Sequence, residues 1–390
     1  MLQDKTLMGV ILAVFLMMIG VGLIVAILPQ RIVDLDGNGQ SVGYLASAFA
    51  FSYILLQVPI GNLSDKFGFK PFLILGYFLC FITGLVFFFA TSSNMIFFAR
   101  ALQGVGEAPI WALAPALLSL KFPLAKGKVM GMYNAAIHFG LTLGPILGVV
   151  LANTFNLKEI FLVYSFNCLA GMLVIYFLLE DSNKNKTQTT TSLNFLDILQ
   201  LVKQQQTLIT LLGITLYGAG YGIFLTTIPT FLLQDRAFSA FDIGIFFSLF
   251  YAAISFSQMI TGPLSDIFGP KLFMICGLLI TAMGIAITPA FGFPLILLVL
   301  TITSLGMGIF YLASMAFLNE IVPNSLKGTV SGAYYLFWGA GMFFGPPIMT
   351  QITVSSNFQA SMTVYSFFLL LVASGMLKIW GWKTAVKHHL

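Results

Sequence analysis

The chain repeats part of its own sequence at a fixed distance of 201 residues. The stretch at 61–70, GNLSDKFGFK, returns at 262–271 as GPLSDIFGPK. A second pattern, Gly140-x-x-x-Gly144-Pro145, returns as Gly341-x-x-x-Gly345-Pro346. A constant spacing over such a length indicates that one structural half was duplicated. In an apolar chain, two matched halves predict a membrane protein with a pathway between them.

The composition supports this class. Hydrophobic residues make up 58% of the chain and charged residues 8%, whereas soluble domains carry about 25% charged residues, so a soluble protein is excluded. The net charge of +5 follows membrane topology and does not indicate a nucleic-acid partner. The cysteines Cys80, Cys168 and Cys276 show neither disulfide nor metal spacing, and we expect no metal and no cofactor.

Apolar runs of about 18 to 27 residues, each long enough to cross a bilayer, alternate with polar or Pro/Gly segments. They predict an all-α membrane protein with 12 transmembrane helices in two pseudo-symmetric six-helix bundles. Residues 181–206 are the only long polar stretch. The expected domains are therefore a bundle at 1–180, a cytoplasmic linker at 181–206 and a bundle at 207–390. The expected spans are 7–29, 40–62, 71–91, 95–120, 127–152, 158–180, 207–233, 240–263, 271–290, 293–319, 328–352 and 357–380.

Basic residues fix the expected orientation. With the N-terminus in the cytoplasm, Arg31, Lys158 and Arg236 fall outside and Arg100 falls within a span, while the other 14 of the 18 basic residues fall inside. Such a bias predicts that both termini are cytoplasmic. We expect a multi-pass protein of the cytoplasmic (inner) membrane whose halves are parallel repeats.

The duplicated motif at 61–70 and 262–271 is predicted to lie between two helices on the cytoplasmic side. Its glycines allow close approach and turning of the chain, and its aspartates can face the positive end of a neighbouring helix. One copy alone would be an ordinary turn with positive-inside lysines, but two equivalent copies favour a conformational latch. The residues of this expected latch are Gly61, Asp65, Lys66, Gly68, Lys70, Gly262, Asp266, Gly269 and Lys271.

The second pattern places glycines four residues apart on the span 127–152, where they form one small-residue stripe that lets another helix pack closely. The span 328–352 repeats it with Met349 in place of the last glycine. We expect these stripes at the interface between the bundles. The residues are Gly131, Gly140, Gly144, Pro145, Gly148, Gly332, Gly341, Gly345 and Pro346.

These motifs resemble those of the major facilitator superfamily over nearly the whole chain. The stretch 61–70 matches the superfamily's signature for the loop between helices 2 and 3, except at Phe69, where a basic residue is usual. The glycine stripe at 131–148 resembles the antiporter motif of the twelve-helix drug:proton antiporters. Arg100-x-x-Gln103-Gly104 resembles that family's third motif, whose arginine is implicated in proton coupling. The resemblance implies the fold of this superfamily and export by proton antiport.

Arg100 and Glu107 both fall within the span 95–120, where a charge costs about 2.5–3.5 kcal/mol on insertion scales. They lie about 10 Å apart along the helix, and Gln103 between them is a candidate relay. We expect Glu107 to load and release a proton, although a permanently neutral Glu107 bonded to Gln103 or to a carbonyl is the alternative. The 201-residue spacing maps Arg100 to Thr301 and Glu107 to Gly308. No acidic residue lies in 7–29, where many drug:proton antiporters carry one, so the prediction depends on Glu107.

His138 is the only histidine within a span. It is interpreted as a neutral packing residue, with proton transfer as the alternative. Aromatic and amide residues can line a cavity for amphipathic or aromatic cargo. The candidates are Tyr53, Gln57, Trp111, Asn134, Tyr251, Gln258, Tyr334, Tyr335 and Trp338.

No nucleotide-binding loop occurs in the sequence, so we expect transport driven within this chain to use a gradient or none. The leading hypothesis is a monomeric transporter, not an enzyme, that exports lipophilic or amphipathic small molecules in exchange for protons by alternating access. Its partners are the substrate, protons and the lipid bilayer. One alternative is a facilitator or other carrier of a metabolite, siderophore or lysolipid. A transport-dead sensor is the third hypothesis.

Overall fold

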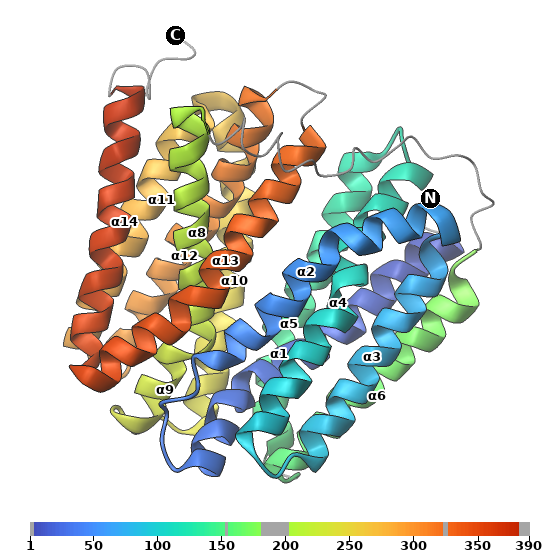
Figure 1. Cartoon of the computed structure of the whole chain (residues 1–390), viewed down its shortest axis with the longest axis horizontal. Coiled ribbons are helices and arrows are strands. Elements are labelled where there is room, and N and C mark those ends of the chain that lie inside the picture. Colours follow the sequence, from blue (N-terminus) through green and yellow to red (C-terminus); the bar gives the residue numbers. More distant parts are fainter. Residues whose placement is uncertain (1–3, 153–154, 181–202, 323–326, 382–390) are drawn as a thin grey trace. The chain divides into compact units, whose positions relative to one another are not determined.

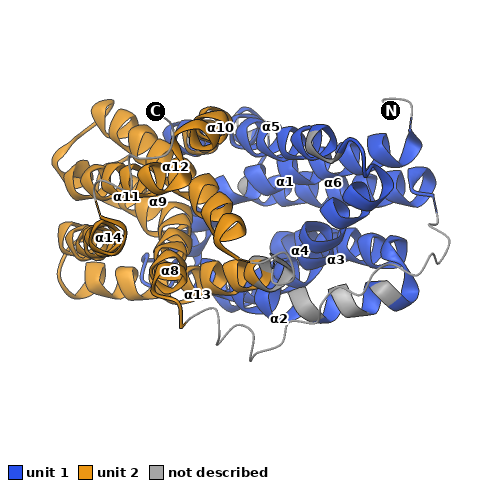
Figure 2. Ribbon diagram, turned by 90° about the horizontal axis from the view of Figure 1, so that it is seen from above, with its two compact units in different colours: residues 1–190, 238–248 blue, residues 191–237, 249–390 orange. Residues whose placement is uncertain are grey.

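The structure, a computed structural model, describes residues 4–152, 155–180, 203–322 and 327–381. All regular structure in these residues is helical (Figure 1). Contacts divide the chain into two compact units (Figure 2), residues 1–190 with 238–248 and residues 191–237 with 249–390. Most of the expected linker at 181–206 lies outside the described residues, and the expected domain boundaries remain a prediction.

The first unit contains six long helices. Within it, α1 packs against α5 and α6, α3 packs against α4 and α6, and α2 packs against α4. The bounds are α1 Lys5–Asp36, α2 Tyr44–Phe67, α3 Phe69–Phe89, α4 Ser93–Lys121, α5 Lys126–Ala152 and α6 Leu157–Leu178.

The second unit repeats this pattern, because α8 packs against α13 and α14, and α11 packs against α12 and α14. Helix α10 begins in the segment 238–248, which groups with the first unit. The bounds are α8 Gln205–Leu225, α9 Thr227–Gln234, α10 Ala240–Phe268, α11 Pro270–Ile287, a 3₁₀ turn η1 Thr288–Ala290, α12 Leu295–Ile321, α13 Lys327–Ser355 and α14 Phe358–Trp380.

The described residues thus contain twelve helices of 18 residues or more, which confirms the predicted fold class. Eight spans in the described chain are long and apolar enough to cross a membrane by composition alone. The four helices outside that set are α2, α4, α5 and α13. These four carry the buried charges, the first copy of the duplicated motif and the glycine stripes.

Two of the expected spans are wrong in extent. Helix α1 continues past residue 29 to Asp36 and ends at Gly37, whose φ of 73° lies in the left-handed region. Asp34 and Asp36, expected in an outer loop, are therefore exposed residues of its last two turns. The span expected at 207–233 breaks at Thr226, because Pro229 has no N–H to bond the Leu225 carbonyl.

Candidate functional site

A chain of hydrogen bonds runs along α4 through four side chains. Arg100 Nη1 donates to Gln103 Oε1 at 2.7 Å, and Gln103 Nε2 donates to Glu107 Oε1 at 2.8 Å. Trp111 Nε1 donates to the second carboxylate oxygen, Oε2, at 2.9 Å. The spacings of three, four and four residues place these side chains on one face of the helix. Gln103 therefore joins a cation and a carboxylate that do not form a direct ion pair.

Arg100, Gln103 and Glu107 are 4%, 0% and 3% exposed, so the chain is isolated from water along this part of α4. A guanidinium only donates and a carboxylate only accepts. The Gln103 amide satisfies both when its oxygen faces Arg100 and its NH₂ faces Glu107. Both oxygens of Glu107 already accept an N–H, so a proton added to either one competes with Gln103 or with Trp111.

Helix α2 supplies two further contacts of the Arg100 guanidinium. Its Nε donates to the Leu45 carbonyl at 3.1 Å, and the group lies 4.8 Å from the Phe49 ring centroid, within cation–π range. Gly104 permits this approach, because a Cβ there would lie 2.3 Å from Ser52 Oγ. Ser52 Oγ in turn donates to the Ala101 carbonyl at 2.6 Å. Close packing of α2 and α4 thus holds the buried cation.

In the second unit, uncharged residues occupy the positions equivalent to Arg100 and Glu107. These positions differ from the predicted ones. A Cβ on Gly76 would lie 2.5 Å from the Gly106 carbonyl oxygen, and one on Gly277 would lie 2.7 Å from that of Gly306. Gly76 and Gly277 are 201 residues apart, whereas Gly106 and Gly306 are 200 apart. The mapping to Thr301 and Gly308 is therefore wrong by one residue, because the spacing shortens between the third and fourth helices. The true equivalents of Arg100, Gln103 and Glu107 are Leu300, Thr303 and Met307.

The duplicated motif lies on helices rather than in a loop, which corrects the prediction. Residues 61–67 and 262–268 form the last turns of α2 and α10, and only Gly68 and Gly269 separate these helices from the next ones. Their φ angles of 83° and 80° confirm that the glycines turn the chain, since other residues rarely adopt this region.

The motif's charged residues have varied surroundings. Lys66 and Asp266 are exposed. Lys70 lies 5.8 Å from the Tyr176 ring, and its counterpart Lys271 lies 5.8 Å from both the Phe317 and Trp380 rings. The structure does not describe the side-chain surroundings of Gly61 and Asp65. The latch function remains a prediction.

The glycine stripes pack inside each unit, which corrects their assignment to an interface between bundles. A Cβ on Gly140 would lie 2.7 Å from Met18 Cβ, and one on Gly144 would lie 2.5 Å from the Ile19 carbonyl oxygen. Gly148 likewise faces Leu23, and Gly22 faces Pro145, so the stripe of α5 packs against α1. The stripe packs against α1 because α1 also presents a glycine, Gly22, at the contact. With small residues on both helices, the two backbones can approach closely.

The stripe of α13 packs in the same way against α8. A Cβ on Gly341 would lie 1.8 Å from the Thr215 carbonyl oxygen, and one on Gly345 would lie 2.4 Å from Ala219 Cβ. Pro346 is buried on the same helix, and Gly332 is half-buried. Gly131 belongs to neither contact, since nothing lies within 4 Å of a Cβ built there.

The expected cavity residues are scattered over both units. Tyr53 and Tyr251 are buried, and Tyr53 stacks on Phe49 with ring centroids 5.5 Å apart. Asn134 is exposed, and His138 and Gln258 are half-buried. The surroundings of the Gln57 side chain are not described. Trp111 belongs to the hydrogen-bonded chain on α4. Tyr334, Tyr335 and Trp338 belong to one group of contacting aromatic rings in the second unit.

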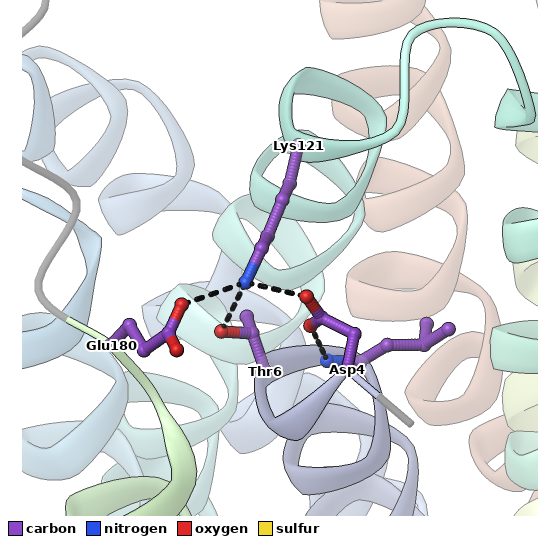
Figure 3. Close-up of polar contacts among 5 residues, drawn as sticks. Asp4, Thr6, Lys121 and Glu180 are labelled. Atoms are coloured by element: carbon purple, nitrogen blue, oxygen red, sulfur yellow. Dashed lines mark hydrogen bonds and ion pairs between the residues drawn. The ribbon is translucent and has the colours of Figure 1, made fainter. Parts of the chain in front are cut away.

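A charge cluster at the helix ends of the first unit was not predicted as a site. Lys121 Nζ, at the end of α4, lies 3.0 Å from Asp4 Oδ2 and 3.0 Å from Glu180 Oε2, and it donates to Thr6 Oγ1 at 2.7 Å (Figure 3). Burial pushes the pKa of Asp4 upward, but hydrogen bonds from Leu7 N–H and Lys121 outweigh it, so the pKa lies below its usual value of 3.8. The sequence separation of these residues hides the cluster from pattern analysis.

Comparisons with known proteins agree with this architecture. The sequence profile of the Major Facilitator Superfamily matches residues 10–239 and 210–389. Multidrug resistance protein 2 of Bacillus subtilis (strain 168) is 25% identical over 390 residues, which cover 97% of this chain and 96% of that protein. Quinolone resistance protein NorA of Staphylococcus aureus (strain MSSA476) is 24% identical over 257 residues, which cover 64% of this chain and 66% of that protein.

Solved structures share the fold at low sequence identity. The nucleoside transporter NupG superimposes with a TM-score of 0.81 at 14% identity, covering 97% of this chain and 99% of that one. A bacterial homolog of the human lysosomal transporter Spinster gives a TM-score of 0.77 at 16% identity, covering 98% of both chains. These likenesses show the fold alone.

Proposed function

The chain belongs to the major facilitator superfamily, a family of membrane transporters rather than enzymes, and we propose that it exports lipophilic or amphipathic small molecules in exchange for protons. It is an integral multi-pass membrane protein. The names of two relatives, a multidrug resistance protein and a quinolone resistance protein, support the cargo class. The excess of basic residues on one side supports an inner-membrane location with cytoplasmic termini, and a monomer suffices for alternating access.

The observation that carries the proton-coupling proposal is the buried chain on α4. Glu107 is the only acidic residue in the interior of a described helix of the first unit, and both its oxygens are engaged by N–H donors. Arg100 balances its charge through the Gln103 amide. Protonation of Glu107 removes the negative charge that faces Arg100 through Gln103, and it weakens the bond to Gln103 or to Trp111. The two protonation states therefore favour different side-chain arrangements, which is what coupling requires.

In the proposed cycle, Glu107 takes up a proton when the site faces the side of higher proton concentration and releases it on the other side. Release restores the bonds from Gln103 and Trp111, and the cargo moves in the opposite sense. The pathway opens alternately to the two sides of the membrane as the bundles rearrange. The duplicated helix-end motifs act as latches in this cycle, and His138 on α5 is a secondary candidate for proton transfer.

Ethidium uptake into inverted membrane vesicles tests the proposal. When the vesicle lumen is more acidic than the outside solution, wild-type vesicles should accumulate ethidium as protons flow out. Glu107→Gln should abolish the accumulation while the protein stays folded, because Gln keeps the shape but cannot lose a proton. Glu320→Gln is the matched control, since Glu320 is an exposed residue near the end of α12. Gradient-dependent uptake that persists in Glu107→Gln would refute the assignment. Uptake that needs no gradient in the wild type would instead indicate a facilitator.

A further inference from the structure

Trp111 is the one partly exposed member of the hydrogen-bonded chain on α4. Its indole Nε1 donates to Glu107 Oε2 at 2.9 Å, whereas Arg100, Gln103 and Glu107 are at most 4% exposed. At the far end of the chain, α2 contacts the Arg100 guanidinium. The chain is therefore enclosed at the Arg100 end, and it reaches exposed surface at the Trp111 end.

The two oxygens of Glu107 differ in how easily they can take a proton. Gln103 cannot turn its amide around, because a guanidinium has no acceptor for the NH₂ group. The amide oxygen therefore stays on Arg100 and the NH₂ stays on Oε1, so a proton on Oε1 would face a fixed donor. Trp111 holds Oε2 by one hydrogen bond, and part of its side chain is not covered by protein. A proton is accepted on Oε2 once the indole N–H moves away.

Few other groups near Glu107 can change charge. Among the described residues, Arg100 is the one charged group that acts on the carboxylate, and the helices packed on α4 carry their charged residues near their ends. The titratable residues in the interiors of the surrounding helices are Tyr53 on α2, Tyr77 and Cys80 on α3, Tyr133 and His138 on α5, and Tyr164 on α6. Phenols and thiols stay largely neutral between about pH 5 and 8, so His138 is the member of this set whose titration must be separated from that of Glu107.

We propose that Trp111 is the gate for proton exchange at Glu107. A hydronium ion transfers its proton to Oε2 and leaves as water, while the indole N–H moves off that oxygen. In the reverse step the proton passes from Oε2 to water, and the N–H returns to the carboxylate. Trp111 is thus a positioning residue that acts through Glu107. This inference rests on the proposed proton exchange at Glu107 and names the residue that controls it.

Trp111→Phe tests the gate, because it keeps an aromatic ring and removes the one N–H of the side chain. Tyr311→Phe is the matched control. Tyr311 on α12 lies 200 residues after Trp111, the spacing that relates α4 to α12, and Met307 stands there in place of the carboxylate. Glu107→Gln supplies the reference that cannot titrate. All variants are studied as purified full-length protein in detergent.

The first measurement is proton release on binding of tetraphenylphosphonium, recorded as a function of pH. A hydrogen bond to the charged form of a carboxylate favours that form, so its loss in Trp111→Phe should move the release profile by about one to two units toward higher pH. Tyr311→Phe should keep the wild-type profile. An unchanged profile in Trp111→Phe would overturn the gate. Loss of probe binding at every pH in that variant would also overturn it, because Trp111 would then belong to the cargo site.

The second measurement is tryptophan emission, since an indole responds to its own hydrogen bond. The chain has four tryptophans. Emission should change with pH in wild type and in Tyr311→Phe, and the change should be absent in Glu107→Gln and in Trp111→Phe. A change that persists in Trp111→Phe would refute the gate, and one that persists in Glu107→Gln would assign the response to another group such as His138. The comparison of wild type with Glu107→Gln decides this even if Trp111→Phe does not fold.

The two measurements also separate this inference from the proposed function. Proton release that is lost in Glu107→Gln but unaltered in Trp111→Phe would refute the gate and leave proton coupling through Glu107 intact. Wild-type protein that shows neither proton release nor a pH-dependent emission would refute both.

Discussion

At the scale of single residues, the central feature is that Arg100 and Glu107 are buried charges joined through Gln103. Removing one member of a buried charge pair costs about 3–5 kcal/mol, because the other charge loses its compensation. Arg100→Met should therefore lower the thermal unfolding temperature of the detergent-solubilised protein clearly. The measurement is a thermal shift assay at neutral pH, with Glu320→Gln as the control that should unfold like wild type.

Replacing Arg100, Gln103 and Glu107 together should have a much smaller effect on the unfolding temperature than replacing Arg100 alone. Apolar groups of similar volume often replace a buried ion pair without loss of stability, so the triple variant R100M/Q103L/E107L should unfold at or above the temperature of Arg100→Met alone and close to wild type. It should show no proton-driven uptake. A triple variant that unfolds well below Arg100→Met would mean that the polar chain stabilises α4 rather than serving transport.

At the scale of helices, close contact between α1 and α5 depends on missing side chains. Gly144→Ala places a methyl group 2.5 Å from the Ile19 carbonyl oxygen, so the backbones must separate, at a cost of about 1–3 kcal/mol. Gly131→Ala on the same helix has nothing within 4 Å and gains helix propensity of about 0.8–1.0 kcal/mol. Thermal unfolding should rank Gly144→Ala below wild type and Gly131→Ala at or above it. Equal effects of the two changes would contradict the packing.

The Lys121 cluster (Figure 3) joins the ends of α1 and α4 to Glu180, just after α6. Lys121→Met should lower stability modestly, by about 0.2–1 kcal/mol per partly exposed ion pair. The Asp4 contribution has a defined pH window: its pKa is lowered, so the stabilisation is full above 3.8 and is lost as the pH falls through the folded-state value. The difference in unfolding temperature between wild type and Lys121→Met should also shrink in 1 M salt, where the Debye length is about 3 Å. A difference that is insensitive to salt would argue against an ionic contact.

At the scale of the whole molecule, the repeat and the apolar runs were sufficient to predict the fold. Span length and period 201 are chain-wide signals, so twelve helices in a repeated packing pattern follow from them. The errors are local. The break at Thr226 depends on Pro229 within an apolar run, although Pro29 in α1 leaves that helix continuous. The one-residue change of spacing at Gly306 arises in the segment between α11 and α12, and only the contact with Gly277 reveals it.

The part of the candidate site that lies within one helix could be predicted from the sequence, whereas contacts between helices could not. Contacts within one helix, such as Arg100 to Gln103 and Gln103 to Glu107, follow from a spacing of three or four residues. The spacing of Trp111 from Glu107 is also four, so their contact belongs to the same class. The Lys121 cluster joins separate helices, so no spacing in the sequence indicates it. The sequence equally does not show which helix packs on a glycine stripe, so the contacts of α5 with α1 and of α13 with α8 appear only in the structure.

The central claim is that Glu107 exchanges its proton for cargo, and proton release on binding tests it most directly. Tetraphenylphosphonium is added to the purified protein in weakly buffered detergent solution, and the pH change is recorded with a dye. The account predicts release of protons from wild type and from Glu320→Gln, and none from Glu107→Gln although the probe still binds. Equal proton release from Glu107→Gln and wild type, or binding to wild type with no release at any pH between 5 and 8, would contradict it.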